Sequence, residues 1–179
     1  MKNLLFAVSL VILLCFTFSC QNKAEKAELE KMRAMETTEE QNQAVARQLH
    51  EALDSQNVNR LIELLAPGAV IHGAGPQEDV TAENAAQFLQ PFYQAFPDLT
   101  HSIEDIFAEG DKVVARVLIQ ATHKGGLQGI PPTGNRVKYY QITILQIVDG
   151  KIKEGWRITD SLGLMMQLGM ELKPKEAKK

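Results

Sequence analysis

One predicted strand carries the residue with the clearest capacity for acid–base chemistry. Residues 151–160 alternate as a strand does, so the side chains of Trp156 and Ile158 share a face with Asp160. A carboxylate held among aromatic and branched side chains has a raised pKa, because burial disfavours its charged form. Such a carboxyl group can accept and return a proton near neutral pH. The alternative is that Asp160, which precedes Ser161-Leu162-Gly163-Leu164, caps a closing helix.

Two histidines could hydrogen-bond the oxygen atom of a carbonyl substrate. His72 follows Val70-Ile71 in a short predicted strand, where it faces either a pocket or the solvent. His123 has the strand parity of Val117, so it lies at the mouth of a pocket or makes structural hydrogen bonds. Both residues are therefore candidate ligand contacts.

Aromatic side chains supply the remaining candidates for a pocket wall. Tyr139 and Tyr140 point to opposite faces of a predicted strand, and we choose Tyr140 because it shares its face with two isoleucines. Phe88, Phe92 and Phe96 follow one side of a predicted helix, where they either fill the core or contact a ligand. Phe92, Trp156 and Ile158 are the predicted apolar contacts.

Several kinds of chemistry find no motif in the sequence. The chain has no nucleophile elbow, phosphate-binding loop, dinucleotide-binding glycine pattern or zinc-protease helix. Its four histidines share no ligand spacing and have no cysteine partners, so we expect no structural zinc site. The net charge of −3 provides no basic footprint for nucleic acid. Acid–base chemistry in a pocket and plain ligand binding remain open.

The hydrophobic periodicity predicts an α+β domain. A capping box at Thr37 and Glu40 is expected to begin a helix, and a second helix stops at Pro67-Gly68. A third helix, which Thr81 can cap, ends at Pro97. The period then changes to two, and Asp149-Gly150 predicts a hairpin. The predicted strands near the end of the chain are residues 113–121, 137–148 and 151–160. Because three predicted helices precede the predicted strands, we expect the helices to pack on one face of a curved antiparallel sheet.

The N-terminus has the pattern of an export signal. Lys2 is followed by an apolar run over residues 4–18, too short to span a membrane, and then by Cys20. This pattern resembles a bacterial lipoprotein signal, whose cleavage leaves a lipidated Cys20; the alternative is an ordinary secretory signal. We therefore expect a signal peptide (1–19), a charged tether (20–36), the folded domain (37–170) and a polar tail (171–179). The expected location is the bacterial cell envelope, with Cys20 anchoring the protein to a membrane.

A series of short segments from residue 96 to residue 169 carries a family resemblance. They are Phe96-Pro97-Asp98-Leu99, Thr122-His123-Lys124-Gly125, Gly129-Ile130-Pro131-Pro132-Thr133-Gly134, Glu154-Gly155-Trp156, Asp160-Ser161-Leu162-Gly163-Leu164 and Gln167-Leu168-Gly169. In this order they resemble the SnoaL-like polyketide cyclases, or ester cyclases, of the nuclear-transport-factor-2-like superfamily. The resemblance covers residues 38–169. It implies a cone-shaped sheet with three helices, a hydrophobic pocket and a homodimer.

The resemblance also implies a reaction. Cyclases of this family close a polyketide ring by intramolecular aldol condensation without metal or cofactor, and Asp160 matches their acid/base aspartate. We therefore expect a metal-free cyclase or isomerase that acts on a small apolar carbonyl compound. Phe92, Trp156 and Ile158 would exclude water, and His72, His123 or Tyr140 would bind the carbonyl oxygen. The alternative is an envelope lipoprotein that binds a hydrophobic molecule without catalysis.

Overall fold

The first helix of the protein is one continuous element. In the computed structural model, which describes residues 2–73, 79–171 and 173, helix α1 spans Lys2–Asp54. The predicted capping box is wrong: Thr37 and Thr38 lie inside the helix, and their hydroxyls donate to the carbonyl oxygens of Arg33 and Ala34, both at 2.9 Å. A threonine hydroxyl can bond the carbonyl four residues earlier, so the same residue types also fit a helix interior.

Residues 1–38 and 39–179 form two compact units. In the first unit, the side chains of residues 23–36 are exposed, as expected for a run of interleaved charges. Among the residues that the structure describes, no helix is long and apolar enough to cross a membrane. The side chain of Cys20 and most of the polar tail lie outside the described part of the chain.

The second unit is built on a five-stranded sheet in the order β1-β5-β4-β3-β2. The strands are β1 (Leu65–His72), β2 (Thr100–Glu109), β3 (Lys112–Thr122), β4 (Arg136–Val148) and β5 (Lys151–Thr159). Strand β1 pairs with β5 in parallel and the other neighbours are antiparallel. The α+β fold class is confirmed, but the sheet is mixed rather than purely antiparallel. Strand β2 was not predicted separately, because a register shift between Ile103 and Asp105 interrupts its alternation.

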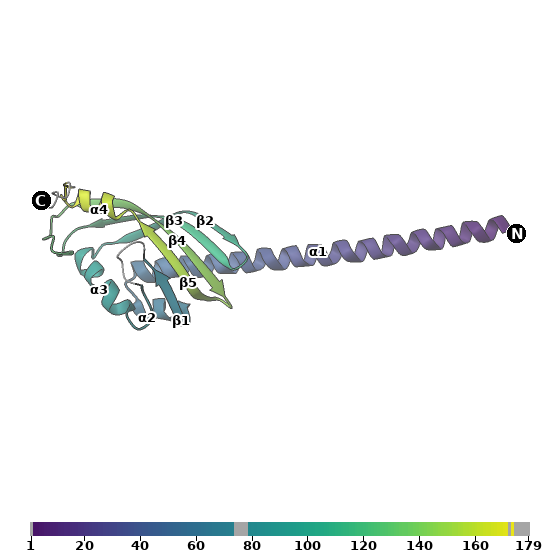
Figure 1. Ribbon diagram of the computed structural model, residues 1–179, viewed down its shortest axis with the longest axis horizontal. Helices are drawn as coiled ribbons and strands as arrows, with labels where there is room; N and C mark the ends of the chain where they lie inside the picture. The colour runs from purple at the N-terminus through teal and green to yellow at the C-terminus, as the bar shows by residue number, and fades with distance from the viewer. Residues whose placement is uncertain (1, 74–78, 172, 174–179) are drawn as a thin grey trace, which may run out of the picture. The chain divides into compact units, whose positions relative to one another are not determined.

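Helices cover one face of this sheet. Helix α2 spans Val58–Leu64, α3 spans Ala85–Ala95 and α4 spans Ser161–Gln167. Figure 1 shows α2 and α3 on the same side of the strands. Buried side chains of α1, α2 and α3 form one hydrophobic cluster with those of β3, β4 and β5. Helix α3 begins after Asn84 rather than at the predicted Thr81 cap, and Asn84 Oδ1 accepts a hydrogen bond from the Thr81 backbone N–H at 2.7 Å.

A bulge in β5 decides which side chains face the helices. Ile152 pairs with Ile147, but the next pair is Glu154 with Gln146, so Lys153 is an extra residue on β5. One extra residue moves every later side chain to the opposite face. Beyond the bulge, the inner face therefore carries the odd-numbered residues of β5, and the even-numbered residues face outward. Trp156 and Ile158 therefore share a face, as expected, but it is the outer face, and the expectation that they face the apolar interior is wrong for this reason.

Candidate active site

The inner face of the sheet and the helices that cover it enclose a cavity of about 460 Å³. This volume lies within the range of about 300–1,000 Å³ that is usual for small-molecule sites. The wall is mostly aliphatic and aromatic. Its polar members are His50, Tyr93, His101, Gln128, Tyr139, Gln141, Thr143, Arg157, Thr159 and Ser161. The cavity thus combines an apolar body with a small set of polar groups.

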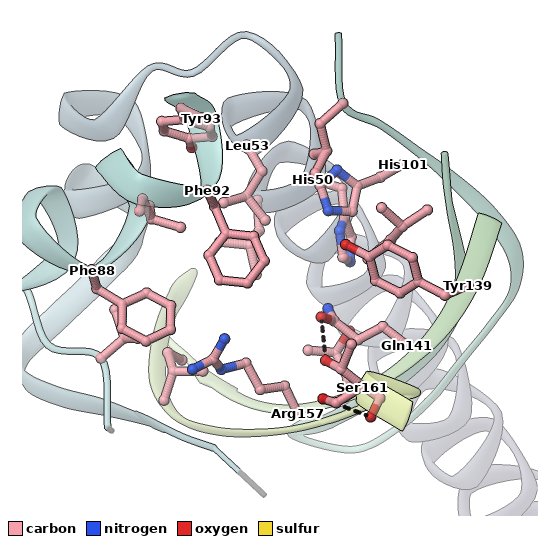
Figure 2. A pocket seen from close by; sticks show the side chains of 18 of the residues that line it. His50, Leu53, Phe88, Phe92, Tyr93, His101, Tyr139, Gln141, Arg157 and Ser161 are labelled. Atoms are coloured by element: carbon pink, nitrogen blue, oxygen red, sulfur yellow. Dashed lines mark hydrogen bonds between the residues drawn. The ribbon is translucent and has the colours of Figure 1, made fainter. Parts of the chain in front are cut away.

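One histidine of the cavity wall, His101, is paired with a carboxylate. Asp54, the last residue of α1, accepts hydrogen bonds on Oδ1 from the backbone N–H of His101 at 2.9 Å and from its Nδ1 at 2.6 Å. The carboxylate therefore fixes the proton of neutral His101 on Nδ1 and leaves Nε2 as an acceptor. The His101 side chain, on β2, is only 6% exposed. The ring of His50 lies against it, with the ring centroids 5.3 Å apart (Figure 2).

Several buried polar atoms of the cavity wall have no hydrogen-bond partner within the described part of the chain. They are both ring nitrogens of His50, the hydroxyl of Tyr93 and the hydroxyl of Thr143. Such atoms are costly in a folded protein unless a ligand or water satisfies them. Burial lowers the pKa of His50 to about 4, so its ring is neutral at pH 7 and has one donor and one acceptor. These atoms are available to hydrogen-bond a ligand or water in the cavity.

Two tyrosines border the same space. Burial raises the pKa of Tyr139 and that of Tyr93, so both hydroxyls stay protonated at neutral pH and can donate a hydrogen bond. Figure 2 shows Tyr139 beside His50 and His101. The predicted choice of Tyr140 is wrong, because β4 turns Tyr139 inward and leaves Tyr140 exposed on the other face of the sheet.

Arg157 brings a permanent positive charge to the opposite side of the cavity. Its guanidinium carbon lies 4.4 Å from the centre of the Phe88 ring, a cation–π arrangement (Figure 2). Burial lowers the pKa of this guanidinium. Next to it, the Thr159 hydroxyl donates to Gln141 Oε1 at 3.0 Å. These inward positions follow from the bulge at Lys153.

Asp160 lies at the end of β5 and caps α4. Its Oδ1 accepts a hydrogen bond from the backbone N–H of Gly163 at 2.8 Å, and the residue is exposed. A Cβ atom at position 163 would overlap the Asp160 carboxylate, so the cap requires Gly163. Asp160 does not belong to the cavity wall. The sequence left a cap and a catalyst as alternatives; the cap is present, and a catalytic role for Asp160 stays a prediction.

The other predicted contacts are divided between the two faces. Phe92 lines the cavity, next to Phe88 with ring centroids 6.5 Å apart. Trp156 pairs with Ile144 and Ile158 pairs with Ile142, all on the outer face. Trp156 and Ile158 are thus absent from the cavity wall. The bulge again explains the difference, since an unbroken strand would have turned both residues inward.

The two predicted histidines also lie outside the cavity wall. His72 is held between carboxylates, with Nε2 3.0 Å from Glu154 and Nδ1 3.1 Å from Asp79. His123 is fully buried and its Nδ1 accepts a hydrogen bond from the Thr133 backbone N–H at 3.2 Å. His123 therefore anchors the loop that contains Thr133, the structural role that the sequence left open.

Sequence reasoning missed the polar residues that do meet in the cavity. His50 stands on the apolar stripe of α1 with Ala46 and Leu49, all buried, and a histidine on such a stripe is a usable signal. Asp54 and His101 are 47 residues apart, so no local pattern joins them. Gly155 was the available sign of a bulge, because a glycine inside a strand often marks one. Within the described residues, no group of three or more His, Cys, Asp or Glu side chains is arranged so that it could hold a metal ion.

Comparisons with known proteins agree with this architecture. Residues 43–168 match the model of the SnoaL-like polyketide cyclases. The chain is 35% identical over 112 residues to the aklanonic acid methyl ester cyclase of Streptomyces peucetius, a match that spans 60% of this chain and 73% of that enzyme. It is 38% identical over 60 residues to the nogalonic acid methyl ester cyclase of Streptomyces nogalater, over 34% of this chain and 45% of that enzyme.

Solved structures show the same fold. IdmH of Streptomyces antibioticus, assigned as a polyketide cyclase, superposes with a TM-score of 0.65 at 32% identity, over 72% of this chain and 99% of that chain. A SnoaL-like protein of Jannaschia sp. CCS1 superposes with a TM-score of 0.67 at 25% identity, over 75% and 96%. The predictions of a nuclear-transport-factor-2-like fold and of a cyclase-type enzyme are confirmed at the level of the family. This chain belongs to the SnoaL-like polyketide cyclase family.

Proposed function

We propose that the protein closes a ring in an apolar dicarbonyl compound by an intramolecular aldol reaction, with His101 as the acid/base. The observation that carries this proposal is that His101, which lines the cavity, is paired through Nδ1 with Asp54 Oδ1 at 2.6 Å. A general base must stand within hydrogen-bond reach of the proton that it removes. The cavity supplies that position for His101 Nε2. Asp160, as the exposed cap of α4, is the alternative acid/base that the same experiments test.

The reaction needs no external reactant. His101 Nε2 removes a proton from the carbon next to one carbonyl group, and the electron pair forms an enolate. The enolate carbon attacks the second carbonyl carbon, which forms the carbon–carbon bond and leaves an alkoxide. The His101 imidazolium, held by Asp54, returns the proton to that alkoxide. The product is an isomer of the substrate, and the side chain ends in its starting state.

The remaining polar groups would stabilise the charge that develops on oxygen. Neutral His50 has one N–H donor and Tyr139 has a protonated hydroxyl, and both line the cavity beside His101. Donors aimed at an oxyanion in a site without bulk water are among the strongest contributions to catalysis. Phe92 and the aliphatic wall would bind the carbon skeleton and exclude water.

The test uses a panel of aryl-substituted 1,5-diketones. Ring closure is followed by chromatography, and exchange of the α-protons with deuterated solvent is followed by NMR. His101→Gln is expected to slow both reactions by about 10²- to 10⁴-fold, with little change in ligand affinity. Full activity of His101→Gln together with a loss in Asp160→Asn would transfer the role to Asp160. Absence of both reactions in the wild type would favour the binding alternative.

We also propose that the protein is an envelope lipoprotein. The support is the apolar run over residues 4–18 that ends close to Cys20. Two or more acyl chains anchor a protein stably where a single chain is marginal. The wild type should partition into detergent, and Cys20→Ala should release it. A wild-type protein with an unmodified N-terminus, recovered wholly in the soluble fraction, would contradict this proposal.

We further propose a homodimer that joins the outer faces of two sheets. The support is the exposed apolar surface formed there by Val114, Tyr140, Ile142 and Ile158. Contiguous apolar surface of this kind usually marks an interface, and twofold dimers are the commonest assembly. Light scattering at micromolar concentration should give the mass of a dimer. Ile142→Lys should give a monomer that keeps its fold, whereas a wild-type monomer would contradict the proposal.

A further inference from the structure

The charge distribution of the cavity wall points to the chemical class of the ligand. Among the described residues of the wall, Arg157 is the one side chain with a permanent charge. His50, on the other side, is neutral at pH 7 because burial lowers its pKa to about 4. The wall otherwise consists of apolar, hydroxyl, amide and imidazole groups. A ligand that enters the cavity therefore meets a positive charge at one end.

The Arg157 guanidinium lies over an aromatic ring of the cavity wall. Its central carbon is 4.4 Å from the centre of the Phe88 ring, and Figure 2 shows the group pointing into the cavity between Phe88 and Gln141. A guanidinium presents a planar fork of N–H donors that matches a carboxylate. It has five such donors, so it can bind a ligand in addition to its contacts within the protein. In a cavity of low polarity, an attraction between opposite charges is much stronger than in water.

We propose that the substrates of this enzyme carry a free carboxylate, and that Arg157 binds it. This inference rests on the proposed function for the site, and it adds the class of substrate. The carboxylate would lie beside Phe88, and the reacting carbonyl groups would lie near His50 and His101, which Figure 2 shows across the cavity. Ring closure does not involve the carboxylate, so the product keeps it. Arg157 thus orients the molecule so that the correct carbon faces His101.

Binding of two matched probes tests this proposal without any need for turnover. The probes are 1-naphthylacetic acid and its primary amide, which have nearly the same shape and differ in charge. Calorimetry at pH 7.5 should show tighter binding of the acid to the wild type. Arg157→Gln should weaken binding of the acid by about 10- to 100-fold, the range for hydrogen bonds to a charged group, and that of the amide by less than about 3-fold. Arg157→Lys keeps the charge without the fork and should lie between.

The outer face supplies a matched control. Arg116 lies over the ring of Tyr140 at 5.4 Å, so the protein has a second arginine–aromatic pair that is outside the cavity wall. Arg116→Gln should leave the affinities for both probes unchanged. Thermal melting of each variant shows whether it is folded at the temperature of the titration.

Three outcomes would overturn the proposal. In the first, the wild type binds the acid no more tightly than the amide, or binds neither probe. In the second, Arg157→Gln weakens binding of both probes equally, which indicates a purely structural arginine. In the third, Arg157→Gln leaves the affinity for the acid unchanged. The proposed function can fail separately. Selective binding of the acid without ring closure would support the carboxylate site and contradict the cyclase chemistry. Ring closure without selective binding of the acid would support the cyclase chemistry and contradict the carboxylate site.

Discussion

In the part of the chain that the structure describes, a histidine meets carboxylate groups at two sites, and the two sites differ in their surroundings. His101, the partner of Asp54, lines the cavity, and its side chain is 6% exposed. His72, Asp79 and Glu154 lie outside it, and their side chains are 32–52% exposed. Contact distances are similar, from 2.6 Å at the inner site to 3.1 Å at the outer one. Burial and access to a cavity, rather than the pairing itself, therefore make a histidine a candidate catalyst.

The first prediction exchanges one carboxylate at each site. Asp54→Asn keeps the shape but no longer holds a charged acceptor against His101 Nδ1, so the tautomer and the developing imidazolium lose their support. Turnover should fall by about 10²-fold or more. Glu154→Gln is the matched change at the outer site and should leave turnover within about 2-fold. Steady-state kinetics on the diketone panel measures both, and equal effects would remove the distinction between the sites.

The second prediction concerns His50, whose ring lies against that of His101 at a tilt of 43° and which is 2% exposed. Burial lowers the pKa of His50 from 6.5 to about 4 in the folded state. The unfolded chain therefore binds a proton between pH 6.5 and 4 that the folded chain does not. The contribution of neutral His50 to the free energy of unfolding is fully present above pH 6.5. As the pH falls from 6.5 to about 4, the free energy of unfolding decreases by roughly 3 kcal/mol.

His50→Gln, which does not titrate, isolates this contribution. The difference in unfolding free energy between wild type and His50→Gln should change by roughly 3 kcal/mol between pH 7 and pH 4, in the direction that makes the wild type relatively weaker in acid. Urea denaturation at several pH values measures it. Since both proteins share all other titrating groups, a constant difference across this range would show that His50 titrates normally.

The third prediction separates capping from catalysis at Asp160. Asp160→Ala should cost about 1 kcal/mol of stability, because the Gly163 N–H loses its acceptor, whereas Asp160→Asn should cost only a few tenths. The corresponding changes in turnover should be small in both variants if His101 is the acid/base. Denaturation curves and kinetics are compared on the same samples. A large rate loss in a stable Asp160→Asn would restore Asp160 as the catalyst.

The fold could be predicted from the sequence much better than the site. Period-two alternation identified β3, β4 and β5, and Asp149-Gly150 identified the hairpin that joins β4 to β5. Both turn residues have positive φ, as a tight two-residue turn requires. These signals are local. Which residues belong to the site depends instead on two features. The extra residue Lys153 reverses the faces of β5, and Asp54 contacts His101 although 47 residues separate them in the sequence. Neither leaves a periodic trace in the chain.

The last and smallest effect concerns the outer histidine. The hydrogen bond with Glu154 is the largest cause that raises the pKa of His72 above 6.5, and Asp79 adds to it. The protonated ring therefore stabilises the fold below pH 6.5, and this contribution is lost as the pH rises through the raised folded-state pKa. The sign is opposite to that at His50. Because the groups are exposed, water and salt screen them and the effect is small.

His72→Gln should lower the melting temperature at pH 5.5 and leave it nearly unchanged at pH 9, with a smaller difference in high salt. A melting temperature shift that is as large at pH 9 as at pH 5.5 would show that His72 acts through its packing on Trp156, with ring centroids 5.7 Å apart, rather than through its charge.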